Sequence, residues 1–317
     1  MADATMRIIR QRALGGPEVL ELMEVPRPDP GPTEVLVRVG GAGVNPVDWK
    51  TRQGGGNLGQ PPFTIGWDVA GVVETVGRGV TRFEPGERVF GMPRFPREAA
   101  AYADYVTSPS RQLARIPAGL DDVEAAALPL AGLTAWQALV ETADVQPGDR
   151  VLILAAAGGV GHLAVQIAKA RGAYVIGTAR SAKHPFLTEL GADETIDYTS
   201  EAVEERVRNV DLVLDLVGSE TSRRALPALR DGGIFITVPS ASGVEPLREL
   251  AGGRVRVTGI LVEPDRAGME AIAGLAATGA LRPHVTRTFP LEQAARAHEL
   301  GETGRNQGKL VLTFLPA

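Results

Sequence analysis

The hydrophobic positions along the chain follow two patterns, and the change falls near residue 121. Before it, stretches such as Glu34–Val44 and Val69–Gly77 alternate loosely between apolar and polar residues, with Gly and Pro between them, as half-buried strands do. The stretch Thr51–Phe63 is so rich in Gly and Pro that it predicts a mobile loop. The first 120 residues therefore predict a mostly β domain.

From Asp121 onward, apolar strands alternate with helices. Asp121 and Glu124 form a capping-box pattern, which predicts a helix running towards Val140. Continuous apolar stretches then predict strands at Val151–Ala156, Ala173–Ala179, Asp211–Gly218 and Gly233–Pro239, with helices between them. Uninterrupted apolar strands indicate a parallel sheet covered on both faces, so this half predicts a doubly wound α/β domain.

The end of the chain differs again. A helix is expected around Leu291–Leu300, followed by the β-rich stretch "QGKLVLTFLPA" with no helix after it. Such a strand could rejoin the first domain.

Composition narrows the class of protein. The 317 residues are 44% apolar and 22% charged with a net charge of −5, which gives no indication of a nucleic-acid or membrane partner. No signal peptide and no spanning segment is expected, so we predict a cytoplasmic protein. The absence of cysteine excludes disulfides, thiolate nucleophiles and Cys-based zinc sites, and four scattered histidines predict no metal site.

The segment "LAAAGGVGHLAV" lies between a predicted strand and a predicted helix, where a dinucleotide-binding turn belongs. Aligned with G-x-G-x-x-G, it places Ala156 first, then Gly158 and Gly161. Gly158 would let the backbone approach a pyrophosphate, and Gly161 would allow close helix–strand packing, with Gly159 and Val160 completing the cradle at the helix N-terminus. The alternative is a tight turn without a ligand.

The end of the next strand indicates which dinucleotide binds. An NAD site usually carries an acidic residue there, whereas this chain has Ala179, followed by Arg180, Ser181 and Lys183. Arg and Lys side chains can pair with a 2′-phosphate, so NADPH is favoured over NADH. Alternatively, both charges are merely solvated and Ser181 is an ordinary N-cap.

Several motifs occur in order along nearly the whole chain: "GAGVNPVDWK", "GWDVAGVVETVGRGVTRFEPGERVFG", "LPLAGLTAWQAL", the glycine turn, "LGADETIDY" and "GKLVL". In these the chain resembles the medium-chain dehydrogenase/reductase superfamily, more closely its zinc-independent quinone oxidoreductase and enone (alkenal) reductase branch. The resemblance implies a discontinuous catalytic domain with a GroES-like β-barrel (residues 1–120 and 284–317), a Rossmann NADP-binding domain (residues 121–283) and a homodimer.

Zinc-dependent members of the superfamily place a metal-ligating Cys in the loop that corresponds to "GVNPVD" and a His near "GWDVAG". This chain has Asn45 and Trp67–Asp68 in those places. The resemblance therefore implies a reaction without zinc. Some zinc-free relatives carry a tyrosine just after the Asn–Asp pair, but here Trp49 and Lys50 stand there.

The resemblance also implies roles for Asn45, Asp48 and Lys50. Asn45 would donate its amide to a substrate carbonyl, Asp48 would hold the loop and the cofactor ribose, and Lys50 would contact the nucleotide first and donate a proton second. The alternative is an Asx-turn built by Asn45 and Asp48, with Lys50 in solvent.

Further cofactor contacts follow from the same resemblance. They are Thr134 at the nicotinamide amide, Tyr198 near the 2′-phosphate, Gly218, Val238, Pro239 and Ser240 along the nicotinamide, and Arg305, Asn306 and Lys309 from the other domain. For Thr134 and Tyr198, ordinary packing roles are the alternatives.

The expected reaction is hydride transfer from NADPH to a flat, uncharged acceptor, either a quinone or the C=C bond of an enal or enone. Two alternatives remain open. One is a 2-enoyl-thioester reductase of the same architecture, and the other is a non-enzymatic NADPH-binding sensor.

Overall fold

The computed structural model describes residues 5–239 and 243–314, and the chain divides into two compact units. Unit 1 comprises Met1–Leu133, Glu263–Gly279 and Pro283–Ala317, and unit 2 comprises Thr134–Val262 and Ala280–Arg282. The compact units and the predicted domains differ in residues 121–133 and 263–279 and in Pro283, which all lie in unit 1. The reason is packing, since helix α2 (Asp122–Ala126) contacts β3 and helix α9 (Arg266–Ala277) contacts β7.

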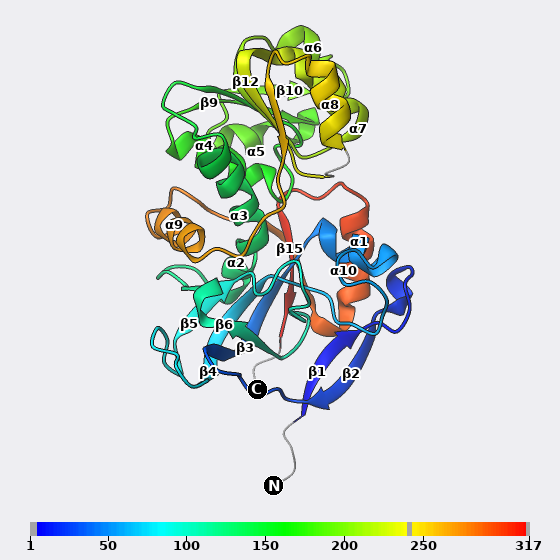
Figure 1. Cartoon of the computed structure of the whole chain (residues 1–317), viewed down its shortest axis with the longest axis vertical. Coiled ribbons are helices and arrows are strands. Elements are labelled where there is room, and N and C mark those ends of the chain that lie inside the picture. Colours follow the sequence, from blue (N-terminus) through cyan, green and yellow to red (C-terminus); the bar gives the residue numbers. More distant parts are fainter. Residues whose placement is uncertain (1–4, 240–242, 315–317) are drawn as a thin grey trace. The chain divides into compact units, whose positions relative to one another are not determined.

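Unit 1 is built on a largely antiparallel sheet with the described strand order β14-β15-β3-β4-β5-β7, to which β6 adds by pairing with β3 (Figure 1). These strands are β3 (Glu34–Val44), β4 (Val69–Val76), β5 (Arg88–Gly91), β6 (Tyr105–Pro109), β7 (Leu113–Arg115), β14 (Val285–Pro290) and β15 (Lys309–Thr313). The mostly β domain predicted for the start of the chain is therefore confirmed.

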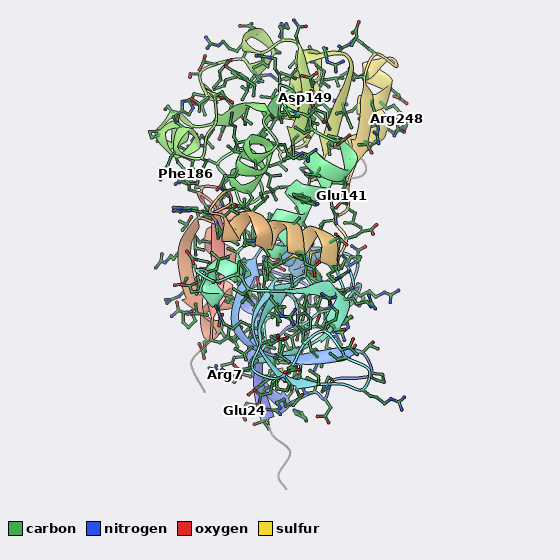
Figure 2. All side chains as sticks on the ribbon, turned by 90° about the vertical axis from the view of Figure 1, so that its left-hand side faces the viewer. Arg7, Glu24, Glu141, Asp149, Phe186 and Arg248 are labelled. Atoms are coloured by element: carbon green, nitrogen blue, oxygen red, sulfur yellow. The ribbon has the colours of Figure 1, made fainter. Side chains whose placement is uncertain are left out.

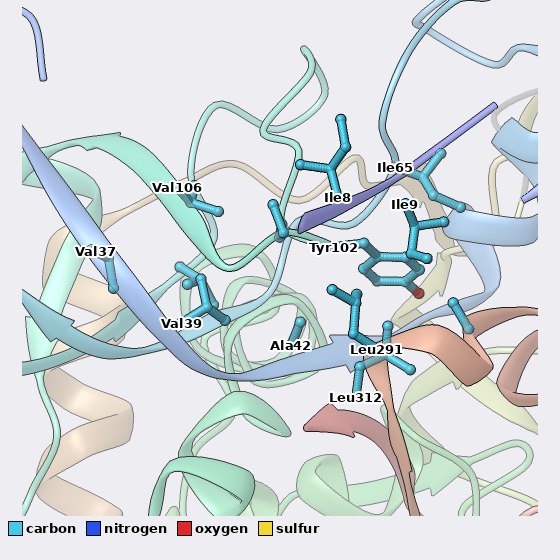
Figure 3. Close-up of a cluster of buried hydrophobic side chains, with 14 of the residues drawn as sticks. Ile8, Ile9, Val37, Val39, Ala42, Ile65, Tyr102, Val106, Leu291 and Leu312 are labelled. Carbon is cyan, nitrogen blue, oxygen red and sulfur yellow. The ribbon is translucent and has the colours of Figure 1, made fainter. Parts of the chain in front are cut away.

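The C-terminal strand β15 lies inside the sheet of unit 1, between β14 and β3. Leu310, Val311 and Leu312 on β15 are fully or almost fully buried, and Leu312 is paired with Ala42 of β3. Figure 3 shows Leu312 in one apolar cluster with Ile9 and other residues from distant parts of the chain. The expectation that the last strand rejoins the first domain is thus confirmed.

Unit 1 also contains a two-stranded sheet, β1 (Thr5–Arg10) and β2 (Glu21–Pro26), which Arg7 joins to neighbouring segments. Arg7 is paired in register with Glu24, and Figure 2 labels both side chains. The Arg7 guanidinium donates to Asp104 at 2.9 Å and also forms an ion pair with Glu292. These bonds fix the two-stranded sheet to two other segments of unit 1.

The prediction of a loop at Thr51–Phe63 is wrong in part, because helix α1 spans Pro46–Gly54. Pro46 occupies the first helical turn, where its missing N–H is tolerated, and Gly55 ends the helix with a φ of 79°. Gly and Pro here mark the two ends of a helix. The chain from residue 55 to residue 63 has turns and no helix or strand.

The helix predicted from Asp121 towards Val140 begins as expected but is not continuous. Asp121 caps α2 through a capping box with Glu124. Helix α3 (Pro129–Trp136) then crosses from unit 1 into unit 2 and continues as a π-helical segment, Gln137–Thr142.

Unit 2 contains a parallel sheet with the described strand order β10-β9-β8-β11-β12-β13. Figure 1 labels β9, β10 and β12 of this sheet. Its strands are β8 (Arg150–Ile153), β9 (Tyr174–Ala179), β10 (Glu194–Asp197), β11 (Val210–Asp215), β12 (Leu229–Thr237) and β13 (Arg256–Gly259). The order runs outward from β8 in one direction and from β11 in the other, which is the order of dinucleotide-binding sheets. The doubly wound α/β prediction is confirmed.

The helices of unit 2 cover both faces of its sheet. They are α4 (Gly161–Ala170), α5 (His184–Glu189), α6 (Val203–Arg206), α7 (Ser219–Ala225) and α8 (Val244–Ala251). Right-handed crossovers place α4 and α5 on one face and α6, α7 and α8 on the other, because the strand order reverses direction between β8 and β11. Among the described residues, none of the helices combines the length and apolar character that crossing a bilayer requires.

We expect Leu312→Ala to destabilise the protein by about 2–5 kcal/mol, because it removes a fully buried side chain from the core of unit 1. The control is Leu22→Ala at a position that is 45% exposed, for which a change within about 0.5 kcal/mol is expected. Urea unfolding of both variants measures the difference. Equal losses would show that β15 is not part of the cooperative core.

Candidate functional site

The strand order of unit 2 reverses between β8 and β11, so the carboxyl ends of these neighbouring strands form a switch point. Ligands of open α/β sheets bind outside the strand ends at such a point. The segments that follow the two strands, residues 154–160 and 216–218, are therefore the candidate cofactor-binding loops of unit 2.

The turn after β8 has the tight geometry that its glycines predict. Ala155 adopts a left-handed φ of 53°, and its carbonyl accepts from the Gly158 backbone N–H at 2.9 Å. A Cβ on Gly161 would lie 2.4 Å from the Ala155 oxygen and 2.7 Å from Cα of Ala156, so only glycine fits there. A Cβ on Gly158 would meet only that oxygen, at 3.2 Å. The turn thus presents Gly158, Gly159 and Val160 in front of helix α4.

His162 lies behind this turn as a buried helix residue. Its Nδ1 is 2.9 Å from the Gly158 carbonyl, and its ring stacks on Phe186. It supports the shape of the turn from within unit 2.

An acidic residue that the sequence reasoning missed lies at the end of β10. Asp197 is the register partner of Ala179, and its carboxylate accepts from the Ser181 backbone N–H at 2.9 Å. Thr199 donates to the other oxygen through both its backbone N–H and its hydroxyl. These hydrogen bonds lower the pKa of Asp197. The Asp197 carboxylate thus stabilises the turn that carries Ser181.

The basic residues of this turn are close to Tyr198. Arg180 and Tyr198 are both exposed, and Arg180 Nε lies 3.4 Å from the Tyr198 hydroxyl. The neighbouring Lys183 is half-buried, and its pKa is lowered by burial and then by the charge of Arg180. Arg180, Ser181, Lys183 and Tyr198 are therefore brought together at one end of β9 and β10.

A second buried aspartate shapes the loop after β11. Asp215 is fully buried, and one oxygen accepts from the backbone N–H groups of Val217 and Gly218 at 2.9 Å each. The other oxygen accepts from the hydroxyls of Ser222 and Thr237. Sequence reasoning found Gly218 but not the carboxylate that holds its backbone.

The remaining predicted contacts are placed as follows. Thr134 is buried in α3, Val238 and Pro239 are half-buried directly after β12, and Ser240 lies outside the described residues. In unit 1, Arg305 is exposed, and Asn306 donates to the Leu300 carbonyl at 3.3 Å.

The candidate substrate-side residues of unit 1 lie at the start of α1. Asn45 is the N-cap residue, and the Asp48 carboxylate accepts from its backbone N–H at 2.6 Å, which is one half of a capping box. Asn45 is 2% exposed and Asp48 is fully buried, whereas Lys50 points to solvent. The Asp48 half of the local turn considered as the alternative is therefore present as a helix cap, whereas the Asn45 side chain makes no capping hydrogen bond.

Lys309, which was predicted as a cofactor contact, is bound to other residues of unit 1. It is 2% exposed, and its ammonium donates to the Val44 carbonyl at 3.1 Å, to Oδ1 of Asn45 and to Oδ2 of Asp68 at 3.3 Å. An ammonium has three donors, so none remains for a nucleotide. These contacts favour an internal role for Lys309 over the predicted contact with the cofactor.

The same contacts fix the Asn45 side chain. Its Nδ2 donates to Oδ2 of Asp68 at 2.8 Å, while its Oδ1 faces the ammonium, which can only donate. Asp68 also accepts from the Leu130 backbone N–H at 2.6 Å. One amide N–H of Asn45 is therefore committed, and the amide has a single orientation.

A second buried series of hydrogen bonds also ends on Oδ2 of Asp48. The Arg52 guanidinium donates to Nδ1 of His298 at 3.1 Å, Nε2 of His298 lies 3.1 Å from the Tyr102 hydroxyl, and that hydroxyl donates to Asp48 at 3.1 Å. Arg52 also donates to the half-exposed Glu302 at 2.6 Å. Arg52, Tyr102 and His298 are functional candidates that sequence reasoning missed.

The direction of this series follows from its first donor. Because a guanidinium never accepts, Nδ1 of His298 is the acceptor and its proton lies on Nε2. Burial and then the charge of Arg52 lower the pKa of His298 to about 3, which keeps the ring neutral. Every hydrogen bond therefore points towards Asp48. Since Arg52 cannot give up a proton, this series of hydrogen bonds orients Asp48 and does not conduct protons.

Asp48 keeps one buried oxygen, Oδ1, without a hydrogen-bond partner. Burial raises its pKa to about 7, although its bond from the Asn45 backbone opposes the shift. The carboxyl group at the start of α1 therefore changes charge near neutral pH.

Comparison with known proteins assigns both halves of the chain. Residues 31–118 match the family described as "Alcohol dehydrogenase GroES-like domain", and residues 190–312 match "Zinc-binding dehydrogenase". A 2-haloacrylate reductase from Burkholderia sp is 36% identical, over 94% of this chain and 96% of its own length.

Two solved structures are similar over nearly the whole chain. The quinone oxidoreductase from Coxiella burnetii is 36% identical with a TM-score of 0.92, and the match covers 98% of this chain and 99% of the other. The quinone oxidoreductase of Escherichia coli, solved with NADPH, is 31% identical with a TM-score of 0.87, over 98% and 100% of the two chains.

The raised pKa of Asp48 predicts a pH-dependent stability difference between the wild type and Asp48→Asn. Between the ordinary value of 3.8 and about 7, the folded state retains a proton that the unfolded chain releases, so raising the pH through this window weakens the wild type. Asn keeps an acceptor for Tyr102 but does not titrate. We expect the free energy of unfolding of Asp48→Asn to rise relative to the wild type between about pH 5 and about pH 8.

Urea unfolding at each pH measures this difference. His298 is present in both proteins, so its own titration largely cancels. The control Asp29→Asn makes the same change of side chain at an exposed position. A flat difference for Asp48→Asn would contradict the raised pKa.

Proposed function

Because this chain belongs to the medium-chain dehydrogenase/reductase superfamily, in its quinone oxidoreductase branch, we propose that it is an NADPH-dependent reductase that works without zinc. Its acceptor is a quinone or the C=C bond of an α,β-unsaturated carbonyl compound. NADPH, when bound, supplies the hydride.

The observation that carries the proposal is the turn after β8, at the switch point of the sheet in unit 2. Gly161 allows helix α4 to begin directly against the turn, so that backbone N–H groups at the helix N-terminus are available to a pyrophosphate. The E. coli relative was solved with NADPH, which supports the choice of ligand class. We propose Ala156 to Gly161 as the pyrophosphate cradle.

The preference for NADPH rests on the residues after β9. Ala179 leaves no carboxylate at the end of its strand, and Asp197 beside it is occupied by hydrogen bonds from Ser181 and Thr199. Arg180 and Lys183, with Ser181 and Tyr198, are proposed to hold the 2′-phosphate through charge-assisted hydrogen bonds.

On the substrate side, we propose that the remaining amide N–H of Asn45 stabilises the negative charge that develops on the acceptor oxygen. Asp48 acts as a positioning residue at the start of α1, and the exposed Lys50 contacts the nucleotide. Gly218, with Thr134, Val238, Pro239, Arg305 and Asn306, remains a proposed cofactor contact, and a homodimer remains the expected assembly.

Two acceptor classes have direct support from relatives. The Coxiella and E. coli proteins are quinone oxidoreductases, whereas the Burkholderia protein is a 2-haloacrylate reductase, whose name implies a substrate with an activated C=C bond. We propose a small-molecule acceptor of one of these classes for this chain.

The test of the proposed function is oxidation of NADPH and of NADH with three acceptors offered in parallel: a simple quinone, a short enone and a 2-haloacrylate. NADPH-dependent turnover on at least one acceptor is expected, and the ranking identifies the class. NADPH binding without turnover on any acceptor, including a 2-enoyl thioester added as a fourth, would contradict the proposal and favour a sensor.

Arg180→Ala tests the assignment of the 2′-phosphate. The variant should weaken NADPH binding by about 1–3 kcal/mol, the scale of a charge-assisted hydrogen bond, and leave NADH binding nearly unchanged. Titration of each cofactor by fluorescence or calorimetry measures both values. The matched control is Arg206→Ala, which removes another mostly exposed arginine of unit 2 and should affect neither cofactor. Equal losses for NADPH and NADH in Arg180→Ala would rule out the 2′-phosphate role.

A further inference from the structure

The family description "Zinc-binding dehydrogenase" raises the question of whether this chain has a place for zinc. At the positions that correspond to zinc ligands in metal-dependent members, it carries Asn45 and Trp67–Asp68. The indole of Trp67 donates to the Arg97 carbonyl at 2.7 Å and packs edge-on against Phe95, so it offers no ligand atom. Among the described residues, no three His, Cys, Asp or Glu side chains are grouped as a metal site would need.

These residues nevertheless bind a positive charge, which is the side-chain ammonium of Lys309. The Lys309 ammonium lies among a backbone carbonyl, an amide oxygen and a carboxylate oxygen, from Val44, Asn45 and Asp68. Oxygen atoms of these three kinds are what hard metal cations bind in proteins. The ammonium uses all three of its donors on them.

The charges at this place are already balanced. Lys309 and Asp68 are 2% and 0% exposed, and they neutralise each other at 3.3 Å. A divalent ion added here would lie beside a buried ammonium, which is strongly unfavourable away from water. The nearby Asp48 offsets this only in part, because burial raises the pKa of its carboxyl to about 7. The residues present therefore do not fit zinc.

We propose that the Lys309 ammonium is the resident cation of this site, standing where metal-dependent members hold their ion, and that it orients the Asn45 amide. The effect of Lys309 on catalysis rests on the proposed zinc-free function, whereas its role as the resident cation does not. Lys309 acts as a positioning residue: it binds Oδ1 of Asn45 and so turns Nδ2 towards Asp68, with the other amide N–H left over.

The first test measures metal content and thermal unfolding of the wild-type protein dialysed against ZnCl2 and against a chelator. We expect substoichiometric zinc and the same midpoint in both. Stoichiometric zinc together with a raised midpoint would overturn the proposal.

The second test compares two substitutions of the same side chain. Lys309→Ala removes the ammonium and leaves a cavity where it lay. Lys309→Met removes the charge, but its side chain occupies most of the same volume. Both should lower the unfolding midpoint by about 10 °C, because Asp68 is left buried and unpaired. Only Lys309→Ala should regain stability in NaCl or MgCl2 relative to choline chloride of equal ionic strength. The absence of any cation-specific gain would overturn the reading of this place as a cation site.

Two further variants keep the test decisive if the single variants fold poorly. Asp68→Asn combined with Lys309→Met removes both charges and should be more stable than Lys309→Met alone, whereas equal instability would contradict the pairing. Lys169→Met is the matched control, because Lys169 forms a partly exposed ion pair with Asp193, and it should show a small loss without any cation response.

These readouts are independent of the proposed function. If the wild type turns over no acceptor, the proposed activity fails, yet metal content and stability still decide the role of Lys309. If the enzyme is active, Lys309→Met should lower kcat more than it raises KM for NADPH, because Asn45 loses its orientation while unit 2 is unchanged. A rise in KM for NADPH with kcat unchanged would overturn the positioning role and restore Lys309 as a cofactor contact.

Discussion

Lys309 and Asp68 lie 241 residues apart in the chain and meet as a buried ion pair in unit 1. Removing two charges from water costs several kcal/mol for each ion, and only a fully satisfied set of hydrogen bonds offsets that cost. The pair meets this requirement by joining β15, the end of β3, the start of α1 and the backbone of Leu130. The positions of all these segments therefore depend on one requirement: each hydrogen bond of the buried Lys309 and Asp68 must be made.

The network around this pair has a fixed direction because both of its ends can only donate. The Lys309 ammonium starts one branch and the Arg52 guanidinium starts the other. The branches converge on Asp48, whose Oδ2 accepts from both the Asn45 backbone N–H and the Tyr102 hydroxyl. The first turn of α1 is therefore held from two directions, which makes it a rigid support for the exposed Lys50 two residues further on.

Local patterns predicted the parts of the molecule that local physics determines. The continuous apolar strands, the capping box at Asp121 and the steric demand at Gly161 all depend on residues close in sequence. Helix α1 was missed because Pro46 and Gly55 look like loop residues until they are recognised as the two ends of a helix. The capping role of Asp48 could have been found from its spacing to Asn45, since N-cap and N3 positions are three residues apart.

The long-range contacts could not be predicted in the same way. Arg52 and His298 are 246 residues apart, and Tyr102 and His298 are 196 apart, so no spacing in the sequence relates them. A lone His in a helix that also carries Arg and Glu gives no sign of its partners until the fold is known.

The candidate site in unit 2 is formed by backbone groups, whereas the one in unit 1 is formed by side chains. This difference determines which kind of ligand each site suits. In unit 2, backbone groups after β8 and β11 form the proposed cofactor loops, held by carboxylates such as Asp215 that face inward. Such a site suits a ligand common to the whole family. In unit 1, side chains form the site, and most of their donors and acceptors are already used internally. With one amide N–H of Asn45 left over, unit 1 suits an acceptor that needs little polar stabilisation, such as a quinone or an enone, whose conjugation already spreads the incoming charge.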